Sequence, residues 1–484
     1  MYIKRREAPA KERGQLLWRN NLQAARVRAG RRPMAAALLG IMLLLCLSAS
    51  PRAEIWPLPR HMSCVAGSGP VHPGLLAPSI SVALTGPGAG SSVAALAAAR
   101  YQLSLRAAAA VGGEILRVDV AVAAADDALD ARTNYTYELS RQPGSTITGT
   151  AASPFAVAYA LESVLQLSAD TQQRRRCATF SLSDSPRFAH RGLLVDTGRR
   201  FYPVPMLEAL LDAMAAVKLN VLHLYLSEEC FRVESKRFPQ LTASNCTVEP
   251  NFHYSSPGYY TQQQVRSLVL FARLRGIRLL PEIDLPAHSA GICAGLRNAG
   301  IVCCGKGGKY GFGQILDDQH GQSVALVQQL LAEISELFPE SLFHVGADET
   351  GSTPPCTHDN TRNFERKILR FVSTQLDKTP VVWEEALFES GAVNLTLPHK
   401  VIIDTWQTAG WQQAAVAGYN VVASREPRLY LDYPEHSAAA MWYDLLNGSS
   451  NPKLVSRLLG AEVSMWSDRY VPRVSSSLLV QLLQ

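Results

Sequence analysis

Eight apolar runs in the second part of the chain restrict its fold more than any other feature. They are Gly192–Thr197, Asn220–Leu226, Arg278–Asp284, Leu342–Ala347, Val381–Ala386, Val401–Trp406, Asn420–Ser424 and Ala461–Trp466. Helical patterns separate them, as in Gln263–Gly276 and Val324–Phe338. Nearly continuous apolar runs are typical of parallel strands buried on both faces. Eight such strands with intervening helices predict a closed (β/α)8 barrel, a TIM barrel, in an α/β chain.

The region that precedes these runs has a different pattern. Strand-like segments occur at Ser79–Leu84, Gln102–Leu105, Ile115–Val122 and Tyr135–Leu139, and helical ones at Val93–Arg100 and Pro154–Leu167. Several of the strand-like segments alternate with period two, whereas the helical ones place apolar residues on one face. We therefore expect a small α+β domain at 54–185 and the barrel at 186–484.

The N-terminus has the pattern of an export signal. Residues 1–33 hold ten Lys or Arg and two acids, and fourteen apolar residues follow from Met34 to Leu47. A basic region, a short apolar region and small residues after it are typical of a secretory signal peptide. The leader at 1–53 is therefore predicted to be a cleaved signal or an uncleaved signal-anchor. A buried N-terminal helix is the third interpretation, and Met34 is an alternative start.

Charge argues against nucleic acid as a partner. The chain carries +6, and the ten basic and two acidic residues of its first 33 positions contribute +8, so the remainder carries −2. A nucleic-acid binder needs a basic surface on its folded part. The only membrane contact that we expect is through an uncleaved leader.

Two further patterns agree with export. Asn-x-Ser/Thr sequons, which are glycosylation candidates, occur at Asn134, Asn245, Asn394 and Asn447. Eight cysteines follow the leader, and an oxidising compartment allows them to form disulfides. The adjacent Cys303 and Cys304 are expected to bond elsewhere rather than to each other. No cysteine or histidine spacing suggests zinc, and we predict neither a metal nor a cofactor.

Polar and aromatic residues gather where the predicted strands end. The carboxylates there are Asp196, Glu228, Asp284, Asp348, Glu349, Asp432 and Asp468, and they are joined by Arg199, His288, Tyr430, Trp383, Trp406 and Trp466. Catalytic groups of a TIM barrel project from these ends. Indole faces beside carboxylates suit a sugar ring, which has apolar faces and a hydroxyl rim. The sequence therefore favours a carbohydrate site.

Structural interpretations stay open for these residues. Asp196 and Arg199 can form a structural ion pair, and His288 can be a satisfied loop histidine. The three tryptophans can belong to the core, while Glu384 and Glu385 can be solvated charges.

Several motifs in order resemble glycoside hydrolase family 20, the β-N-acetylhexosaminidases. His344-Val345-Gly346-Ala347-Asp348-Glu349 resembles the family motif His-x-Gly-Gly-Asp-Glu. The segments His190–Arg199, Leu219–His223 and Glu282–His288 look like the first three barrel strands of the family, and Trp56–Pro59 looks like the start of its mature chain. The resemblance spans roughly Trp56 to Tyr470.

The resemblance implies a role for each site residue. In this family the 2-acetamido group of the substrate is the nucleophile. Glu349 would be the general acid and base, and Asp348 would orient the acetamido nitrogen. Tyr430 would hold the acetamido oxygen, between walls formed by Trp383, Trp406 and Trp466. Arg199, Asp432 and Asp468 would bind ring hydroxyls, and Glu228 with His288 would form a relay toward Glu349.

The chain departs from the family pattern at several positions. Ala347 replaces a glycine, Glu228-Glu229 replace an Asp pair, Tyr225 stands where His is frequent, and Asp468 where Glu is common. By position, Cys303 and Cys356 resemble the disulfide of the family, and Cys230–Cys246 is a second candidate pair. The long final helix of the family is replaced by Val474–Leu483, or the barrel is truncated at its last helix.

The strand-end residues favour a carbohydrate site, and the resemblance implies an exo-acting retaining glycosidase. It would remove terminal β-linked GlcNAc or GalNAc from glycoconjugates or chitooligosaccharides, with the glycan as its partner and a homodimer as a state frequent in the family. One alternative is a catalytically weakened glycan-binding protein, and another is a hydrolase of plain β-glucosides. We expect a secreted, lysosomal or vacuolar protein, with membrane anchoring as the alternative.

Overall fold

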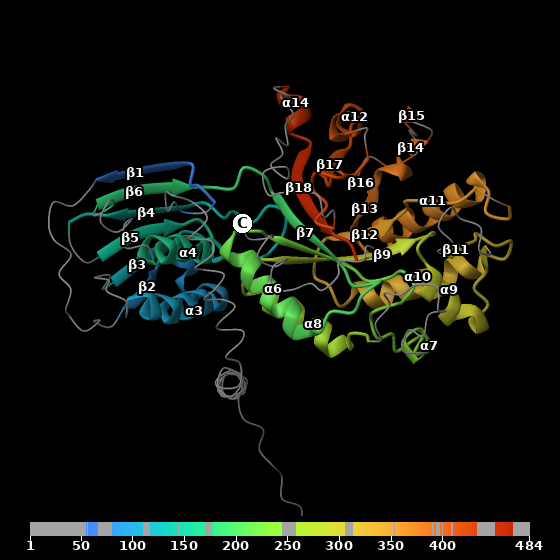
Figure 1. The fold of residues 1–484 in the computed structure, drawn as a ribbon, viewed down its shortest axis with the longest axis horizontal. Coiled ribbons are helices and arrows are strands. Elements are labelled where there is room, and N and C mark those ends of the chain that lie inside the picture. Colours follow the sequence, from blue (N-terminus) through green and yellow to red (C-terminus); the bar gives the residue numbers. More distant parts are fainter. Residues whose placement is uncertain are drawn as a thin grey trace, which may run out of the picture. The chain divides into compact units, whose positions relative to one another are not determined.

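The computed structural model describes most of the chain between residues 55 and 467 (Figure 1). The described residues are 55, 57–65, 80–109, 117–143, 146–169, 177, 179–243, 258–304, 313–352, 354–389, 392–393, 397–398, 400–407, 410–432 and 451–467. The predicted leader, Trp56, Val474–Leu483 and three sequons (Asn245, Asn394 and Asn447) lie outside them. Within these ranges, none of the helices has the length and apolar character needed to cross a bilayer.

Eight parallel strands close into a barrel, as the apolar runs predict. They are β7 (His190–Asp196), β8 (Val221–Tyr225), β9 (Arg278–Leu285), β12 (Leu342–Gly346), β13 (Thr379–Trp383), β16 (Ile402–Thr405), β17 (Asn420–Ala423) and β18 (Leu458–Met465). Strand β18 pairs with β7 from Gly460↔His190 to Met465↔Val195 and so completes the ring. The predicted TIM-barrel fold is therefore confirmed.

Helices follow the barrel strands along the chain. They are α6 (Val204–Ala216), α7 (Gln240–Ala243), α8 (Gln262–Arg273), α9 (Ala290–Leu296), α10 (Gln322–Ser335), α11 (His358–Thr374), α12 (Gly410–Val416) and α14 (Pro452–Val455). Helix α8 begins at a capping box, in which the Thr261 hydroxyl accepts from the Gln264 backbone N–H and the Gln264 side chain accepts from the Thr261 N–H. Between β13 and β16 the described chain instead holds the 3-10 turn η3 (Glu384–Ala386) and the short strands β14 (Phe388–Glu389) and β15 (Ala392–Val393).

The barrel interior is layered. An apolar floor is formed by Val221, Leu280, Leu342, Val381, Ile402 and Val422. Two residues further along the strands lies an ionic layer, which consists of His223, Glu282, His344, Asp404 and Glu462, all buried. Above it, Leu194, Tyr225 and Trp383 pack with Trp406 and Trp466 at the end where the loops carry the site. The alternation of side chains along each strand places every second residue inward and produces these layers.

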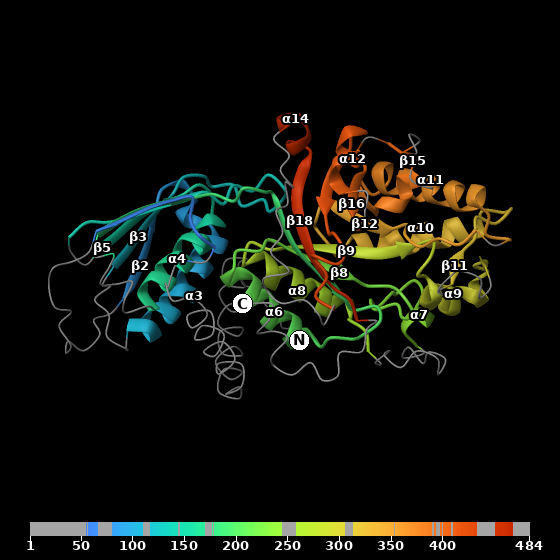
Figure 2. The same ribbon diagram turned by 45° about the horizontal axis from the view of Figure 1, so that its top comes forward.

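A six-stranded mixed sheet precedes the barrel. In spatial order its strands are β1 (His61–Val65), β6 (Thr179–Asp184), β4 (Tyr137–Arg141), β5 (Thr146–Ala151), β3 (Arg117–Val122) and β2 (Ser81–Thr85). Helices α3 (Ser92–Ala109) and α4 (Ala156–Ala169) lie on one face, as Figure 2 shows. A single apolar cluster fills the space between helices and sheet. The predicted α+β character of this part is confirmed.

One predicted strand is wrong. Gln102–Leu105 belongs to helix α3, although its residues alternate between apolar and polar. The buried positions Ala94, Ala97, Ala98, Tyr101 and Leu105 follow a spacing of three to four, whereas Leu103 is exposed. The helical period over the longer window therefore overrides the short alternation. Strands β1, β5 and β6 are additions to the predicted set.

A buried lysine joins the barrel to the six-stranded sheet with helices α3 and α4, here called the sheet domain. Lys218 follows α6, and its Nζ donates to the Tyr137 hydroxyl at 2.7 Å and to the Ser163 hydroxyl at 3.1 Å. The same ammonium lies 3.2 Å from Asp184 Oδ2. The Tyr159 hydroxyl donates to the Lys218 carbonyl at 2.9 Å. The sheet domain therefore contacts both the ammonium and the carbonyl of Lys218.

The cysteine pairing differs from the predicted one. Cys303 is bonded to Cys293, and Cys304 is bonded to Cys356, so the predicted Cys303–Cys356 pair is wrong. The two adjacent cysteines form strand β10 (Cys303–Cys304), and successive side chains of a strand point to opposite sides. A further disulfide joins Cys64 to Cys177 in the sheet domain. Cys230 is also disulfide-bonded, but Cys246 lies outside the described residues, so the Cys230–Cys246 pair stays a prediction.

Candidate active site

The turn after β12 carries Asp348 and Glu349 in an unusual backbone conformation. Gly346, Ala347 and Glu349 have φ values of 70°, 77° and 46°. A Cβ atom on Gly346 would lie 1.6 Å from Asp284 Oδ1, so only glycine fits at this position. Ala347 occupies a left-handed conformation that glycine adopts more readily, and its backbone N–H donates to Asp284 Oδ1 at 3.2 Å. Positive φ at several non-glycine residues is typical of functional turns.

His288 lies beneath both carboxylates of this turn. Its Nε2 is 3.4 Å from Glu349 Oε2 and 3.7 Å from Asp348 Oδ2, and its Nδ1 is 2.8 Å from Glu228 Oε2. Burial alone would lower the pKa of His288, but Glu228, Asp348 and Asp284 outweigh it and hold that pKa well above its usual value. The ring therefore connects Glu228 to the Asp348–Glu349 turn as an imidazolium.

Arg199 lies at the side of the same cluster. Its guanidinium is 3.2 Å from Asp196 Oδ2 and 3.4 Å from Glu228 Oε2. The ion pair with Asp196 that the sequence suggests is therefore present. The guanidinium also lies over the Trp466 and Tyr225 rings, at 5.5 and 5.6 Å from their centroids. Two carboxylates and two rings hold this cation, and its side chain keeps 13% exposure.

Four aromatic side chains form a connected wall, here called the aromatic rim: Trp383, Trp406, Tyr430 and Trp466. The ring centroids are 6.1 Å apart for Trp383 and Trp466, 6.2 Å for Tyr430 and Trp466, and 6.4 Å for Trp406 and Tyr430. Trp383 is buried, whereas Trp406 and Trp466 are partly buried. The wall is thus part core and part surface of the site.

Carboxylates hold two of these indoles in place. The Trp383 Nε1–H donates to Glu282 Oε1 at 2.9 Å, and the Trp406 Nε1–H donates to Glu385 Oε2 at 3.0 Å. Glu384 is buried and accepts from the Gln407 backbone N–H at 3.1 Å. The interpretation of Glu384 and Glu385 as solvated charges is therefore wrong.

Asp348 combines burial with an unsatisfied acceptor. Burial raises the pKa of Asp348 well above its usual value, the neighbouring Asp284 carboxyl raises it further, and His288 acts in the opposite direction. Among the described residues, no N–H or hydroxyl group donates to its buried Oδ1. An orphaned acceptor at the mouth of a barrel is suited to an N–H donor from a ligand.

The remaining predicted residues differ in burial and in whether the structure describes them. Asp432 comes two residues after Tyr430 and is buried. Asp468 lies outside the described residues. Asn134 is exposed on the sheet domain. The structure thus brings Arg199, Glu228, His288, Asp348, Glu349 and the aromatic rim into one cluster.

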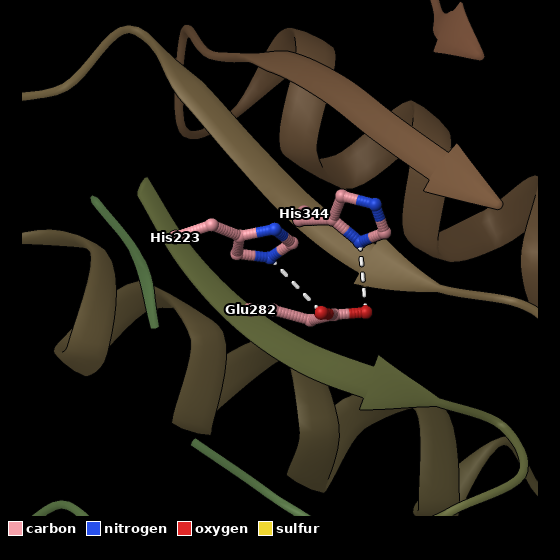
Figure 3. A group of neighbouring side chains, drawn as sticks. All are labelled: His223, Glu282 and His344. Atoms are coloured by element: carbon pink, nitrogen blue, oxygen red, sulfur yellow. Dashed lines mark ion pairs between the residues drawn. The ribbon is translucent and has the colours of Figure 1, made fainter. Parts of the chain in front are cut away.

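Beneath this cluster, the ionic layer forms a hydrogen-bonded chain that sequence reasoning did not single out. His223 Nε2 is 2.9 Å from Glu282 Oε2, and His344 Nδ1 is 2.9 Å from Glu282 Oε1 (Figure 3). On its other side, His223 Nδ1 is 2.7 Å from Glu462 Oε1. His190 Nε2 extends the chain at 3.0 Å from Glu462 Oε2. These residues stand at inward positions of the predicted strands, which is the signal that would have found them.

Among the described residues, two triads offer atoms that lie close enough together for a shared cation. They are His223, Glu282 and His344, and Asp284, His288 and Asp348, with ligand atoms within 4.8 Å of one another. Both ring nitrogens of His223 face carboxylate oxygens, and so do both ring nitrogens of His288. An imidazole in that position donates two hydrogen bonds and has no lone pair for a metal. The protons on these two histidines therefore account for the geometry of both triads.

The sequence of the chain is similar to those of curated beta-hexosaminidases. Beta-hexosaminidase 1 of Arabidopsis thaliana is 29% identical over 316 residues, which cover 60% of this chain and 54% of the relative. Beta-hexosaminidase subunit beta of Homo sapiens is 29% identical over 314 residues, with the same two coverages. The chain spans about half the length of these curated relatives.

Solved structures share the fold. The GH20 exo beta-N-acetylglucosaminidase of Vibrio harveyi, in complex with N-acetylglucosamine, superposes with a TM-score of 0.68 at 22% identity, over 89% of this chain and 74% of that one. The Streptomyces plicatus N-acetyl-beta-hexosaminidase superposes with a TM-score of 0.68 at 21% identity, over 89% and 88%. Residues 188–473 match the model of glycosyl hydrolase family 20, catalytic domain. With the barrel, the turn after β12 and this match in agreement, the chain belongs to glycosyl hydrolase family 20.

Proposed function

We propose that the protein is a β-N-acetylhexosaminidase that removes terminal β-linked GlcNAc or GalNAc from glycans by substrate-assisted catalysis. The observation that carries this proposal is the buried Oδ1 of Asp348, which accepts from none of the described residues. Asp348 precedes Glu349 in the turn, and its charge acts on Tyr430 of the aromatic rim. An acetamido N–H is the donor that suits this oxygen. The indoles would enclose the acetamide methyl group and hold its oxygen toward the anomeric carbon.

The geometry supports a division of labour between the two adjacent carboxyls. Glu349 would protonate the leaving oxygen and later activate water. Asp348 would accept the acetamido N–H and stabilise the cationic oxazolinium intermediate. Donation from that N–H, together with the developing positive charge, favours the ionised form of Asp348 against the burial that raises its pKa.

Tyr430 would donate to the acetamido oxygen from the aromatic rim. Arg199, Asp432 and Asp468 would bind ring hydroxyls, and the first of these is already oriented by Asp196. His288 and Glu228 would position Glu349 through the contacts at 3.4 and 2.8 Å.

The proposal is tested by comparing wild type with Glu349→Gln on two aryl β-GlcNAc substrates, one with a poor leaving group and one with a good leaving group. We expect kcat/KM of the variant to fall about 100- to 10,000-fold on the poor leaving group and less on the good one, because only the poor leaving group needs a proton. Product binding by calorimetry should persist. Glu336→Gln, an exposed change on the outside of the barrel, is the matched control.

Three outcomes would contradict the proposal. Equal rates for Glu349→Gln and wild type would remove Glu349 from its role. Similar wild-type rates on an aryl glucoside and on its 2-acetamido counterpart would exclude substrate assistance. Sugar binding by wild type without turnover would identify a glycan-binding protein instead.

We further propose that the chain enters the secretory pathway, to be secreted or delivered to a lysosome or vacuole. The three disulfides between described cysteines support an oxidising compartment. Asn134 is exposed and available for glycosylation. Enzymatic removal of N-glycans from the protein made in a eukaryotic host should lower its apparent mass, and an unchanged mass in both wild type and Asn134→Gln would contradict modification at this site.

A further inference from the structure

A single buried phenol lies between two carboxyl groups under the site. The Tyr225 hydroxyl is 2.8 Å from Glu228 Oε2 and 2.8 Å from Asp284 Oδ2, and all three side chains are buried. Tyr225 and Glu228 are also two of the positions at which the sequence departs from the pattern of the family.

The geometry requires a proton on one of the two carboxyls. A phenol has one proton to donate, and its oxygen can accept from another donor. Two carboxylates at 2.8 Å would leave one oxygen facing a lone pair of the phenol in a dry site, which is strongly unfavourable. One carboxyl therefore accepts from Tyr225, and the other donates to it.

The surroundings decide which carboxyl carries that proton. Glu228 has the Arg199 guanidinium at 3.4 Å and His288 Nδ1 at 2.8 Å, so its negative charge is compensated. Burial would raise the pKa of Glu228, but these two cations lower it below its usual value. Burial raises the pKa of Asp284 to about 7, with His288 opposing and Glu282 adding to the rise. Glu228 is thus the acceptor of Tyr225, and Asp284 is the donor.

Two branches lead from the phenol to the two proposed catalytic carboxyls. On one side, Glu228 contacts His288, whose Nε2 lies 3.4 Å from Glu349. On the other side, Asp284 lies within hydrogen-bonding reach of Asp348 and accepts from the Ala347 N–H of the same turn. The two branches end on neighbouring residues, because Asp348 and Glu349 are adjacent in the turn.

We propose that Tyr225 is a positioning residue that connects the supports of Glu349 and Asp348 and keeps Glu228 ionised beneath His288. The inference rests on the proposed function and deepens it. The phenol is buried and acts through Glu228 on one side and Asp284 on the other. Without it, Glu228 loses a donor, His288 loses part of its counter-charge, and the proton on Asp284 loses its acceptor.

Charged groups from several strands surround Tyr225, Glu228 and Asp284. They are Asp196 and Arg199 after β7, Glu229 after β8, Glu282 on β9, and Asp348 and Glu349 after β12. The Tyr225→Phe substitution changes none of these groups. It removes one oxygen and keeps the ring on which Arg199 packs. The variant therefore tests the hydroxyl alone.

The experiment compares kcat and KM of wild type and Tyr225→Phe across pH, with an aryl β-GlcNAc as substrate. We expect kcat to fall about 10- to 100-fold with KM little changed, because a buried hydrogen bond is lost away from the substrate. The acid limb of kcat/KM should move to higher pH, since Glu228 takes up a proton more readily once a donor to its carboxylate is gone. The matched control is Tyr419→Phe, which removes a buried phenol oxygen that donates to the Leu397 carbonyl at 2.9 Å.

A spectroscopic measurement separates this inference from the proposed function. The infrared C=O band of a protonated carboxyl should be present in wild type near pH 6, vanish in Asp284→Asn, and shift to higher frequency in Tyr225→Phe, where the acid loses its acceptor. This result needs no substrate. A wild type without turnover would defeat the proposed function, and the infrared band alone would then decide the inference.

Two results would overturn the inference. One is that the wild type is active, and Tyr225→Phe has the same kcat and the same acid limb of kcat/KM as the control Tyr419→Phe. The other is an infrared spectrum in which Asp284→Asn removes no carboxyl band. Folding of each variant is checked by its thermal unfolding temperature, and for a Tyr225→Phe protein that does not fold, the wild-type and Asp284→Asn spectra still decide.

Discussion

Gly346 shows how closely the backbone approaches a carboxyl in the turn that carries Asp348 and Glu349. An added Cβ would lie 1.6 Å from Asp284 Oδ1 and 2.3 Å from its Cγ, in a backbone conformation with φ of 70°. Two penalties therefore coincide in Gly346→Ala, the left-handed backbone and the collision. We expect a loss of about 2–5 kcal/mol in the free energy of unfolding, measured by chemical denaturation, and a fall in activity because the turn must move.

The control for this prediction is another glycine of the same backbone class. Gly321 has φ of 67°, and no other atom lies within 4 Å of the position that an added methyl group would take. Gly321→Ala should therefore cost only the backbone term, about 1 kcal/mol, and leave activity unchanged. An equal loss in the free energy of unfolding for the two variants would show that the Asp284 side chain moves away from the added methyl group at no energetic cost.

At the scale of elements, four strands meet through buried charges. Burial would lower the pKa of His223, but Glu462 on β18 and Glu282 on β9 outweigh it and raise that pKa to about 10. Burial would raise the pKa of Glu282, but His344 and His223 outweigh it and lower that pKa to about 2. His223 thus links Glu282 on β9 to Glu462 on β18, two strands that are distant in sequence. Glu282 also holds Trp383 in place, because it accepts from the indole N–H.

This arrangement predicts the pH dependence of stability. The pKa of His223 is raised by folding, so its contribution is complete below about pH 6.5 and is lost as pH rises toward 10. The pKa of Glu282 is lowered, so its contribution is complete above about pH 4.5 and is lost as pH falls toward 2. In His223→Gln the two carboxylates lose their cation, and we expect a loss of about 3–5 kcal/mol at pH 7 that shrinks toward pH 5, where they take up protons.

Denaturant unfolding at pH 5, 7 and 9 measures this effect. His320→Gln, an exposed change before α10, should show the wild-type profile. A His223→Gln protein whose deficit is constant between pH 5 and 7 would argue against a charged His223.

Much of the fold is readable from the sequence, because a barrel strand is a local pattern. Each predicted run overlaps an observed strand, and the turn with Asp348 and Glu349 follows directly from one of them. The partner of Cys303 is not local, since the path of the loops decides whether Cys293 or Cys356 comes near it. The same holds for Tyr225, whose partners are set by the depth at which β8 and β9 pair: Tyr225↔Glu282 places Asp284 next to the phenol only once the barrel has closed.

At the scale of the whole molecule, Lys218 connects the sheet domain to the barrel. Burial lowers the pKa of Lys218, and Asp184 opposes that change. Lys218→Met keeps the length of the side chain and removes the ammonium, so Asp184, Tyr137 and Ser163 lose a shared partner. We expect a loss of about 2–4 kcal/mol and a calorimetric trace in which the two parts unfold in separable transitions.

The matched change for this prediction is Lys453→Met. Lys453 is exposed on α14 and should leave the thermal trace as in wild type. A Lys218→Met protein with a single, unshifted transition would mean that the apolar contacts between the two parts are sufficient without the ammonium.

The pairing of β18 with β7 has a consequence for biosynthesis. His190 contacts Glu462, which is 272 positions further along the chain, and these residues belong to the first and last barrel strands. On the ribosome the six-stranded sheet is available early, whereas the ring stays open, with unpaired edges and exposed ions, until translation reaches β18. The yield of folded protein would therefore depend on how well the open ring is protected from aggregation during that interval.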